Sequence, residues 1–177
     1  MTQRTMSDLS RRRFMAVAAT GATLAVVEGV VFSPREAWAL DPAGLKPETV
    51  QTLIRLSRDI YPHDQLADKF YAVAVKDFDD AAAKDAAKKA LYENGVTTLD
   101  TLAAAAGVAR YVDIGWESER LKILNQIEAT PFFQAVRGSL VVGLYNQKAV
   151  WPIFGYEGAS ADKGGYLHRG FNDIDWL

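Results

Sequence analysis

The stretch 47-PETVQTLIRLSRDIYP-62 decides the fold, because it predicts an amphipathic helix with a defined beginning and end. Pro47 is favoured at a first helical position, and Pro62 biases Tyr61 away from α geometry. Side chains between these prolines recur at the three- and four-residue spacing of one helical face: Val50, Leu53, Ile54, Ser57, Ile60 and Tyr61. We therefore predict a helix from Pro47 to Ile60.

Further helices are expected downstream of this one. After a turn at 61–64, Asp64 can cap a second helix, whose apolar stripe is Leu66, Phe70, Val73, Ala74 and Phe78. The alanine- and lysine-rich run 79–91 predicts a solvent-facing helix, and Asn94-Gly95 predicts a turn that ends it. The pattern then favours a short helix, Leu99 to Ala106, with a start box at Thr97 and a stop at Gly107.

The next stretch begins with a strand-like segment and continues with two helices. Tyr111 to Gly115 is the only strand-like segment that we identify. Glu117 to Glu128 predicts an amphipathic helix, with Leu121, Leu124 and Ile127 on one side. Thr130 and Pro131 then form a good cap and first position for a very apolar helix ending at Asn146.

Two alternatives concern this last helix. A strand over Ser139–Tyr145 competes with the helical interpretation. Gly138 and Gly143 weaken a helix by about 1 kcal/mol each relative to alanine, so we expect another backbone to pack closely there.

The C-terminal region from Tyr145 to Leu177 differs in amino-acid composition from the rest of the chain. It holds seven aromatic side chains and is rich in glycine between Gly155 and Gly170, which makes regular helix implausible. Such a segment either packs on the domain's own helices or reaches another protein. We predict an all-α fold, one small domain of about five or six helices, with this long irregular segment lying across its surface.

The N-terminal region predicts an export signal. Ser10-Arg11-Arg12-Arg13-Phe14 precedes a moderately apolar run, Ala16 to Phe32, and Ala37-Trp38-Ala39 is a small-x-small cleavage site. These parts make a secretory signal peptide, and the paired arginines resemble the twin-arginine type. We expect residues 1–39 to be the signal and 40–177 the domain. The signal residues are Arg11, Arg12, Phe14, Ala37 and Ala39.

An uncleaved membrane anchor is the competing interpretation of that run. Glu28 would cost about 2–3 kcal/mol near a bilayer centre, and spanning takes roughly 20 mostly apolar residues. Cleavage is therefore the expectation, with export to the periplasm.

Composition excludes several classes of function. The chain has 20 basic and 22 acidic residues and a net charge of −2, which leaves no electrostatic footprint for nucleic acid or an anionic membrane. It has no cysteine, so disulfides, thiolate metal sites and covalently attached haem are absent. Twin-arginine export suits proteins that fold around a cofactor, yet no cofactor motif is present. A partner exported together with this chain would supply the cofactor.

Single residues with catalytic potential also have structural explanations. His63 beside Asp64 suggests a general base or metal ligand, but a connecting turn with local hydrogen bonds explains the pair better. Asp173 and Asp175 suggest an acid/base pair, but two residues apart on a tail they are better explained as solvated or bound to cations of a partner. Arg137 on an apolar helix suggests a structural pair with a buried carboxylate.

The ordered motifs of the chain resemble the gluconate 2-dehydrogenase subunit 3 family, over about Pro47 to Leu177. They are Tyr61-Pro62-His63-Asp64, Tyr71, Pro131-Phe132-Phe133, Leu144-Tyr145-Asn146, Trp151, Phe154-Gly155-Tyr156-Glu157-Gly158, Gly164-Gly165-Tyr166 and Gly170-Phe171-Asn172-Asp173-Ile174-Asp175-Trp176-Leu177. The resemblance implies a small, cofactor-free subunit. Its companion would be a large FAD-dependent oxidoreductase of the glucose–methanol–choline type, often joined by a c-type cytochrome carrying haem. The large subunit usually lacks its own export signal and is thought to travel with the small one.

We expect the C-terminal segment to bind that partner, because interface energy concentrates in a few buried Trp, Tyr and Arg residues. Tyr156 and Trp176 stacking on a flavin or sugar is the less favoured alternative. The expected partner-binding residues are Tyr145, Trp151, Tyr156, Tyr166, Arg169, Phe171, Asp173, Asp175 and Trp176. Two rival functions stay open: a stand-alone secreted enzyme acting through His63, Asp64 and Asp173, and a periplasmic binding module.

Overall fold

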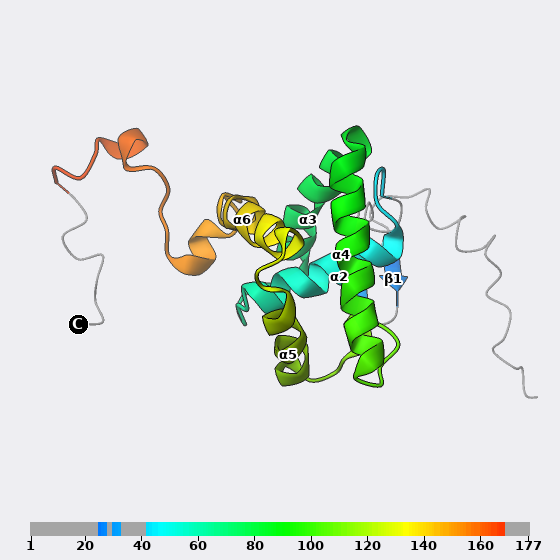
Figure 1. The fold of residues 1–177 in the computed structure, drawn as a ribbon. Helices are drawn as coiled ribbons and strands as arrows, with labels where there is room; N and C mark the ends of the chain where they lie inside the picture. The colour runs from blue at the N-terminus through cyan, green and yellow to red at the C-terminus, as the bar shows by residue number, and fades with distance from the viewer. Residues whose placement is uncertain (1–24, 28–29, 33–41, 169–177) are drawn as a thin grey trace, which may run out of the picture.

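The computed structural model describes residues 25–27, 30–32 and 42–168, and residues 42–168 form an all-α body. The helices are α2 (Pro47–Ile60), α3 (Asp68–Lys84), α4 (Ala86–Ala105), α5 (Glu117–Ile127) and α6 (Pro131–Tyr145). Helix α3 packs against α2, α4 and α6, and α5 lies at one end of the bundle (Figure 1). The predicted fold class is confirmed.

The predicted leader contains a short hairpin. Strands β1 (Ala25–Val27) and β2 (Val30–Phe32) pair antiparallel, with Val26 opposite Val31. Sequence analysis assigned this apolar run to the signal peptide and predicted no strand in it. The predicted signal residues themselves lie outside the described part of the chain: Arg11, Arg12, Phe14, Ala37 and Ala39. Among the described residues, no helix is long and apolar enough to cross a bilayer.

Helix α2 has the predicted bounds and supplies much of the core. Val50, Leu53 and Leu56 are fully buried, and the backbone N–H of Tyr61 still donates to the carbonyl of Ser57 as the helix ends. Burying side chains of this size stabilises a fold by about 1.5–3 kcal/mol each before entropy is counted. Helix α2 is therefore a structural centre of the bundle.

The boundary between α3 and α4 differs from the prediction. Asp64 does not cap α3, which begins four residues later, at Asp68, without a side-chain cap. Instead Asp85 interrupts the alanine-rich run, and its carboxylate accepts from the N–H groups of Ala87 and Lys88 at 2.8 and 3.3 Å. A capped start for α4 therefore lies inside the stretch that we expected to be one continuous helix.

Helix α4 runs through Asn94-Gly95, so the predicted turn there is wrong. The absent side chain of Gly95 makes room for the ring of Phe132, which a Cβ at this position would overlap. The glycine thus serves close packing instead of chain reversal. The short helix expected from Leu99 is the end of α4, and the expected stop is confirmed by Gly107, whose φ is +86°.

The strand-like segment is also corrected. Tyr111–Asp113 forms a 3₁₀ helix, η2. The carboxylate of Asp100 accepts from the N–H of Tyr111 at 2.9 Å, and the Tyr111 ring is fully buried. Tertiary bonds to the tyrosine therefore override the local strand preference.

Helices α5 and α6 match their predictions to within one residue. The hydroxyl of Thr130 accepts from the N–H of Phe133 at 3.3 Å, which confirms the expected cap and excludes the alternative strand over Ser139–Tyr145. A Cβ on Gly143 would lie 3.4 Å from that of Ala74, whereas Gly138 has open space. Close packing explains only one of the two glycines.

The C-terminal segment contains the 3₁₀ helices η3 (Trp151–Phe154) and η4 (Ser160–Lys163), and neither has a buried residue. Figure 1 shows that residues 155–168 extend away from the helices. The start of the segment packs on the bundle, where Val150 is fully buried, but the expectation that the segment lies across the surface is wrong for residues 155–168.

Candidate functional site

An aromatic cluster joins the C-terminal segment to the bundle. The hydroxyl of Tyr145, at the end of α6, lies 2.6 Å from Nε2 of His63. The Tyr145 ring meets those of Tyr61 and His63 edge to face, and the ring of Phe154 lies 4.9 Å from that of His63. Desolvation by burial raises the pKa of Tyr145, so this hydroxyl stays protonated at neutral pH. The predicted turn at 61–64 thus packs under the start of the segment.

The turn that carries His63 is itself fixed from α3. The hydroxyl of Tyr71 donates to the carbonyl of Tyr61 at 2.7 Å and accepts from the N–H of His63 at 3.2 Å. Burial raises the pKa of Tyr71, and the guanidinium of Arg58 lies 5.4 Å from the centre of its ring. These contacts support the structural explanation of His63, which the sequence analysis preferred to a catalytic one.

Trp151 anchors the base of the C-terminal segment, which is the point where the segment leaves the end of α6. Its indole Nε1 donates to the backbone carbonyl of Tyr145 at 2.9 Å. Its ring meets that of Tyr156 edge to face at 5.1 Å, and a Cβ at Gly158, where φ is +97°, would lie 3.4 Å from the indole. The expected partner-binding residues Tyr145, Trp151 and Tyr156 are thus brought together, and the first two pack on the chain itself.

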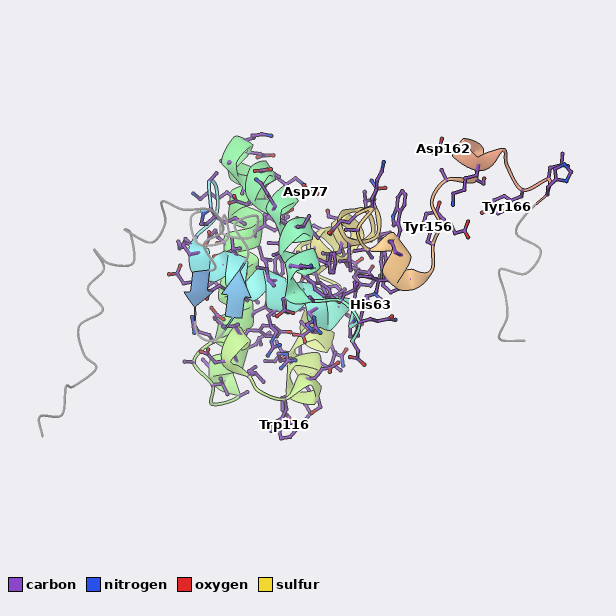
Figure 2. The ribbon with its side chains drawn as sticks, turned by 180° about the vertical axis from the view of Figure 1, so that it is seen from behind. His63, Asp77, Trp116, Tyr156, Asp162 and Tyr166 are labelled. Atoms are coloured by element: carbon purple, nitrogen blue, oxygen red, sulfur yellow. The ribbon has the colours of Figure 1, made fainter. Side chains whose placement is uncertain are left out.

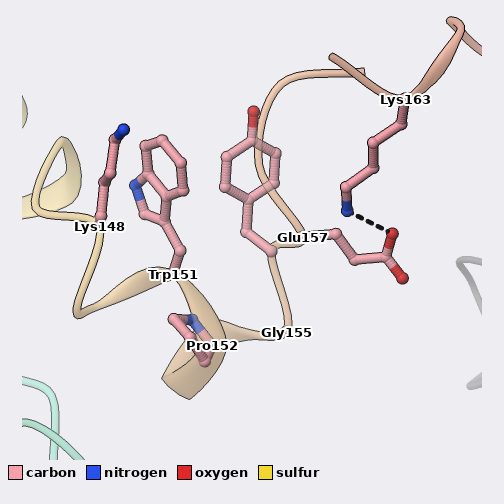
Figure 3. Close-up of a pocket in the computed structure, with 7 residues that line it drawn as sticks. Lys148, Trp151, Pro152, Gly155, Glu157 and Lys163 are labelled. Carbon is pink, nitrogen blue, oxygen red and sulfur yellow. Dashed lines mark hydrogen bonds and ion pairs between the residues drawn. The ribbon is translucent and has the colours of Figure 1, made fainter. Parts of the chain in front are cut away.

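An open cleft of about 420 Å³ lies beside this base (Figure 3). Trp151 and Tyr156 form its aromatic part, and the ammonium group of Lys163 binds the carboxylate of Glu157 at 3.0 Å. Lys148 lines the opposite end of the cleft. The lining can contact a polar or anionic group of another molecule.

Beyond the base, apolar side chains of the segment face solvent. Tyr156, Tyr166 and Leu167 are 49%, 55% and 76% exposed, and Figure 2 shows Tyr166 well away from the bundle, whereas Tyr156 lies beside Trp151. The remaining expected partner-binding residues lie outside the described part of the chain: Arg169, Phe171, Asp173, Asp175 and Trp176.

A buried ion pair that the sequence analysis missed joins α2 to α5. Arg120 Nε donates to Asp59 Oδ2 at 2.8 Å, and the Tyr111 hydroxyl donates to the same oxygen at 2.7 Å. Burial, and then the adjacent Asp59 carboxylate, raise the pKa of Tyr111, which therefore remains a donor. Arg137, suggested above for such a pair, is exposed on α6, and its backbone carbonyl accepts from the Tyr61 hydroxyl at 3.3 Å, so Arg120 takes the role suggested for it.

The sequence pattern of α5 could have indicated this buried pair. The buried positions are Arg120, Ile123, Leu124 and Ile127, whereas the predicted core residue Leu121 is 40% exposed. The spacing of these buried positions is helical, so an arginine in register with the apolar face marks the buried pair.

A second buried carboxylate secures the start of the domain. Asp79 on α3 accepts from the N–H groups of Ala43, Gly44 and Leu45, each at 2.9 Å. Burial alone would raise the pKa of Asp79, but the three N–H donors outweigh it, and the pKa lies below its usual value. A Cβ on Gly44 would overlap the backbone of Ala83. The linker before α2 is thus packed directly on α3.

Metal chemistry receives no support from the described residues, in which no three His, Cys, Asp or Glu side chains gather as a metal site requires. His63 contacts aromatic rings. The arrangement fits structural contacts and protein binding better than acid/base chemistry at His63.

Comparison of the chain with protein-family models, curated proteins and solved structures finds no match. The family resemblance therefore rests on the ordered sequence motifs alone, and the function must be argued from those motifs and from the site.

Proposed function

We propose that this protein is the non-catalytic small subunit of a periplasmic, FAD-dependent dehydrogenase complex acting on a sugar, sugar acid or alcohol. The observation that carries the proposal is the C-terminal segment, which is anchored at Trp151 but extends from the bundle with Tyr156 and Tyr166 exposed. The proposed partner is the large flavoprotein of the glucose–methanol–choline type, which in the family that the chain resembles is often joined by a c-type cytochrome.

The exposure of this segment supports a partner interface. Aromatic side chains are enriched in interface cores, and a pre-positioned anchor lowers the ordering cost of binding. The motifs around Tyr156 and Tyr166 that carry the family resemblance lie in this same segment. Resemblance and geometry thus point to one surface.

The leader supports a role in export. In the proposal, FAD and haem belong to the partners, and this chain assists folding, stability and twin-arginine export of the large subunit. The complex would reach the periplasm and lie at the inner membrane through its other subunits. The signal residues Arg11 and Arg12 would then serve both proteins.

Purification of the native complex, with mass spectrometry of its subunits, tests the proposal. We expect a large flavoprotein that has no signal of its own. Deletion of Gly170–Leu177, and Tyr156→Ser with Tyr166→Ser, should each release the flavoprotein while the helical circular dichroism and the melting temperature stay unchanged. Retention of the flavoprotein by both variants would contradict the proposed interface. Unfolding of the deletion variant would place the tail in the core.

Export is tested separately with Arg11→Lys and Arg12→Lys together. The guanidinium pair differs from two ammonium groups in geometry and hydration, so this change should hold the chain in the cytoplasm and remove the flavin-dependent activity from the periplasm. Activity that persists in the periplasm would contradict the escort role and leave the signal assignment intact.

A binding module is the second candidate, favoured by the aromatic and lysine-lined cleft beside Trp151. Calorimetric titration of the purified chain with neutral sugars and sugar acids distinguishes the two. Tight binding by the chain alone, removed by Trp151→Ala, would favour the module over the subunit.

A further inference from the structure

The C-terminal segment leaves the bundle at Phe154, the last residue of η3 (Trp151–Phe154). The ring of Phe154 lies 4.9 Å from that of His63 and 5.9 Å from that of Tyr145. The next residue, Gly155, has a left-handed backbone with φ of +72°, and residues 155–168 then extend away from the helices (Figure 1). The path of the segment therefore starts from the placement of Phe154.

Two kinds of contact hold η3 on the bundle. The first kind comes from chain neighbours: Val150 is fully buried, Ile153 packs on the core, and the indole of Trp151 donates to the backbone carbonyl at the end of α6. The second kind is the contact of Phe154 with His63, which is distant in the sequence and lies where the segment leaves the bundle (Figure 2). This second contact acts at the end of η3, so it bears directly on the direction that the chain takes next.

The imidazole of His63 is itself fixed on two sides. The backbone N–H of His63 donates to the hydroxyl of Tyr71 at 3.2 Å, and that hydroxyl donates to the carbonyl of Tyr61 at 2.7 Å. The Nε2 atom of His63 lies 2.6 Å from the hydroxyl of Tyr145, and the two rings meet edge to face. Helices α3 and α6 thus place the imidazole on which Phe154 packs.

We propose that His63 is a positioning residue: through its contacts with Tyr145 and Phe154 it fixes the direction in which residues 155–168 leave the bundle. Edge-to-face pairs of rings have a preferred geometry and contribute energy beyond the area that they bury, so this contact favours one orientation of η3. Without the imidazole, Trp151 still holds the start of η3, but the segment loses the contact that selects its direction.

One consequence of this role rests on the proposed function. When the segment binds the flavoprotein, only the molecules in which it points in the binding direction are competent, and the apparent dissociation constant rises as their fraction falls. A ring contact of this kind changes an equilibrium by about 2- to 10-fold, which is the loss of affinity expected when it is removed. His63 thereby acts on the partner through the segment.

The direction of the segment can be measured in the full chain, which contains no cysteine. Ser118→Cys on α5 and Ala161→Cys in η4 introduce two exposed sites for spin labels, and electron paramagnetic resonance gives the distribution of distances between the labels. His63→Ala should broaden this distribution. His63→Phe, which keeps a ring against Phe154, should leave it narrow.

Phe154→Ala tests the same contact from the segment, where the ring is 38% exposed and lies outside the buried core. It should broaden the distribution as much as His63→Ala does, and the double variant should be no broader than either, because both changes remove one shared contact. Leu167→Ala, at a side chain that is 76% exposed in the same segment, is the matched control and should leave the distribution unchanged. Helical circular dichroism and the melting temperature show that each variant is folded.

A distribution that stays narrow in both His63→Ala and Phe154→Ala overturns the proposal, and so does broadening that adds up in the double variant. Flavoprotein binding is measured with the same variants. The dissociation constant should rise about 2- to 10-fold with either alanine and return toward its original value with His63→Phe. Broadening without a change in affinity would support the positioning role and contradict the proposed flavoprotein interface instead.

Discussion

Asp59 and Arg120 form an ion pair of 2.8 Å between Oδ2 and Nε, and their side chains are only 3% and 6% exposed. The same guanidinium also donates two hydrogen bonds, to the carbonyls of Ile114 and Gly115. The pair thus links α2 to α5, and the same arginine side chain also fixes the loop that directly precedes α5.

Breaking this pair should be costly. Arg120→Met removes the guanidinium from the buried Asp59 carboxylate and leaves it the Tyr111 hydroxyl as a donor, and breaking a buried pair in this way costs about 3–5 kcal/mol. Urea unfolding should show this loss. Glu119→Gln is the control, because its partner Lys122 is 67% exposed and exposed pairs contribute about 0–1 kcal/mol. A loss no larger than the control's would contradict the structural role of the pair.

Two glycines in helices should respond to alanine with opposite sign. Gly95→Ala would place a Cβ against the ring of Phe132, and overpacking costs about 1–3 kcal/mol. Gly138→Ala meets nothing within 4 Å and should stabilise by about 0.5–1 kcal/mol through helix propensity. Thermal unfolding of the two variants gives the comparison. Equal stabilisation by both would show that Phe132 does not pack on Gly95.

The Asp79 carboxylate should make stability depend on acid pH. Its pKa is lower in the folded chain than in the unfolded one, so its ionised form stabilises the fold above the unfolded value of about 4, and this contribution is lost as the pH falls through the folded pKa. We therefore expect the unfolding free energy of the protein to exceed that of Asp79→Asn by a constant amount near neutral pH. The difference should shrink below about pH 4. A difference independent of pH would contradict the role of the charge.

The His63–Tyr145 contact should contribute stability and no catalysis. Tyr145→Phe removes the hydroxyl that lies 2.6 Å from Nε2 of His63, and the loss of one such bond costs about 0.5–1.5 kcal/mol. Tyr156→Phe, at a 49% exposed ring, should change the unfolding free energy by less than about 0.5 kcal/mol. Dehydrogenase turnover by the isolated chain that Tyr145→Phe or His63→Gln abolishes would favour the rival enzyme.

Elements with local boundary signals were predictable from the sequence. Helix α2 lies between two prolines, and α6 begins at a threonine cap, so the decisive information lies within a few residues of each end. The turn predicted at Asn94-Gly95 failed because the ring of Phe132, distant in sequence, uses the space above that glycine. A rule that considers only neighbouring residues cannot predict a contact between residues that are far apart in the sequence.

The candidate site was predictable in part. Composition named Trp151 and Tyr156 among the expected partner-binding residues but did not pair them, and the structure places their rings 5.1 Å apart. The projection of the segment from the bundle depends on which surfaces the helices leave open, and composition does not encode that. The sequence suggested Arg137 as a partner for a buried carboxylate, but Arg120 pairs with Asp59, and that choice depends on the rotation of α5 against α2.

The bonds from Ala43, Gly44 and Leu45 to Asp79 also define how the protein carries a mechanical load. A pull on the N-terminal side of the domain reaches these three amides before it reaches α2. The load therefore passes through these three hydrogen bonds into α3, and the three bonds share it. The force therefore does not act directly on the N-terminal end of α2, the next helix in the chain, and does not separate that helix from the bundle. Tension along the leader is thus resisted first by α3, the helix that packs against three others.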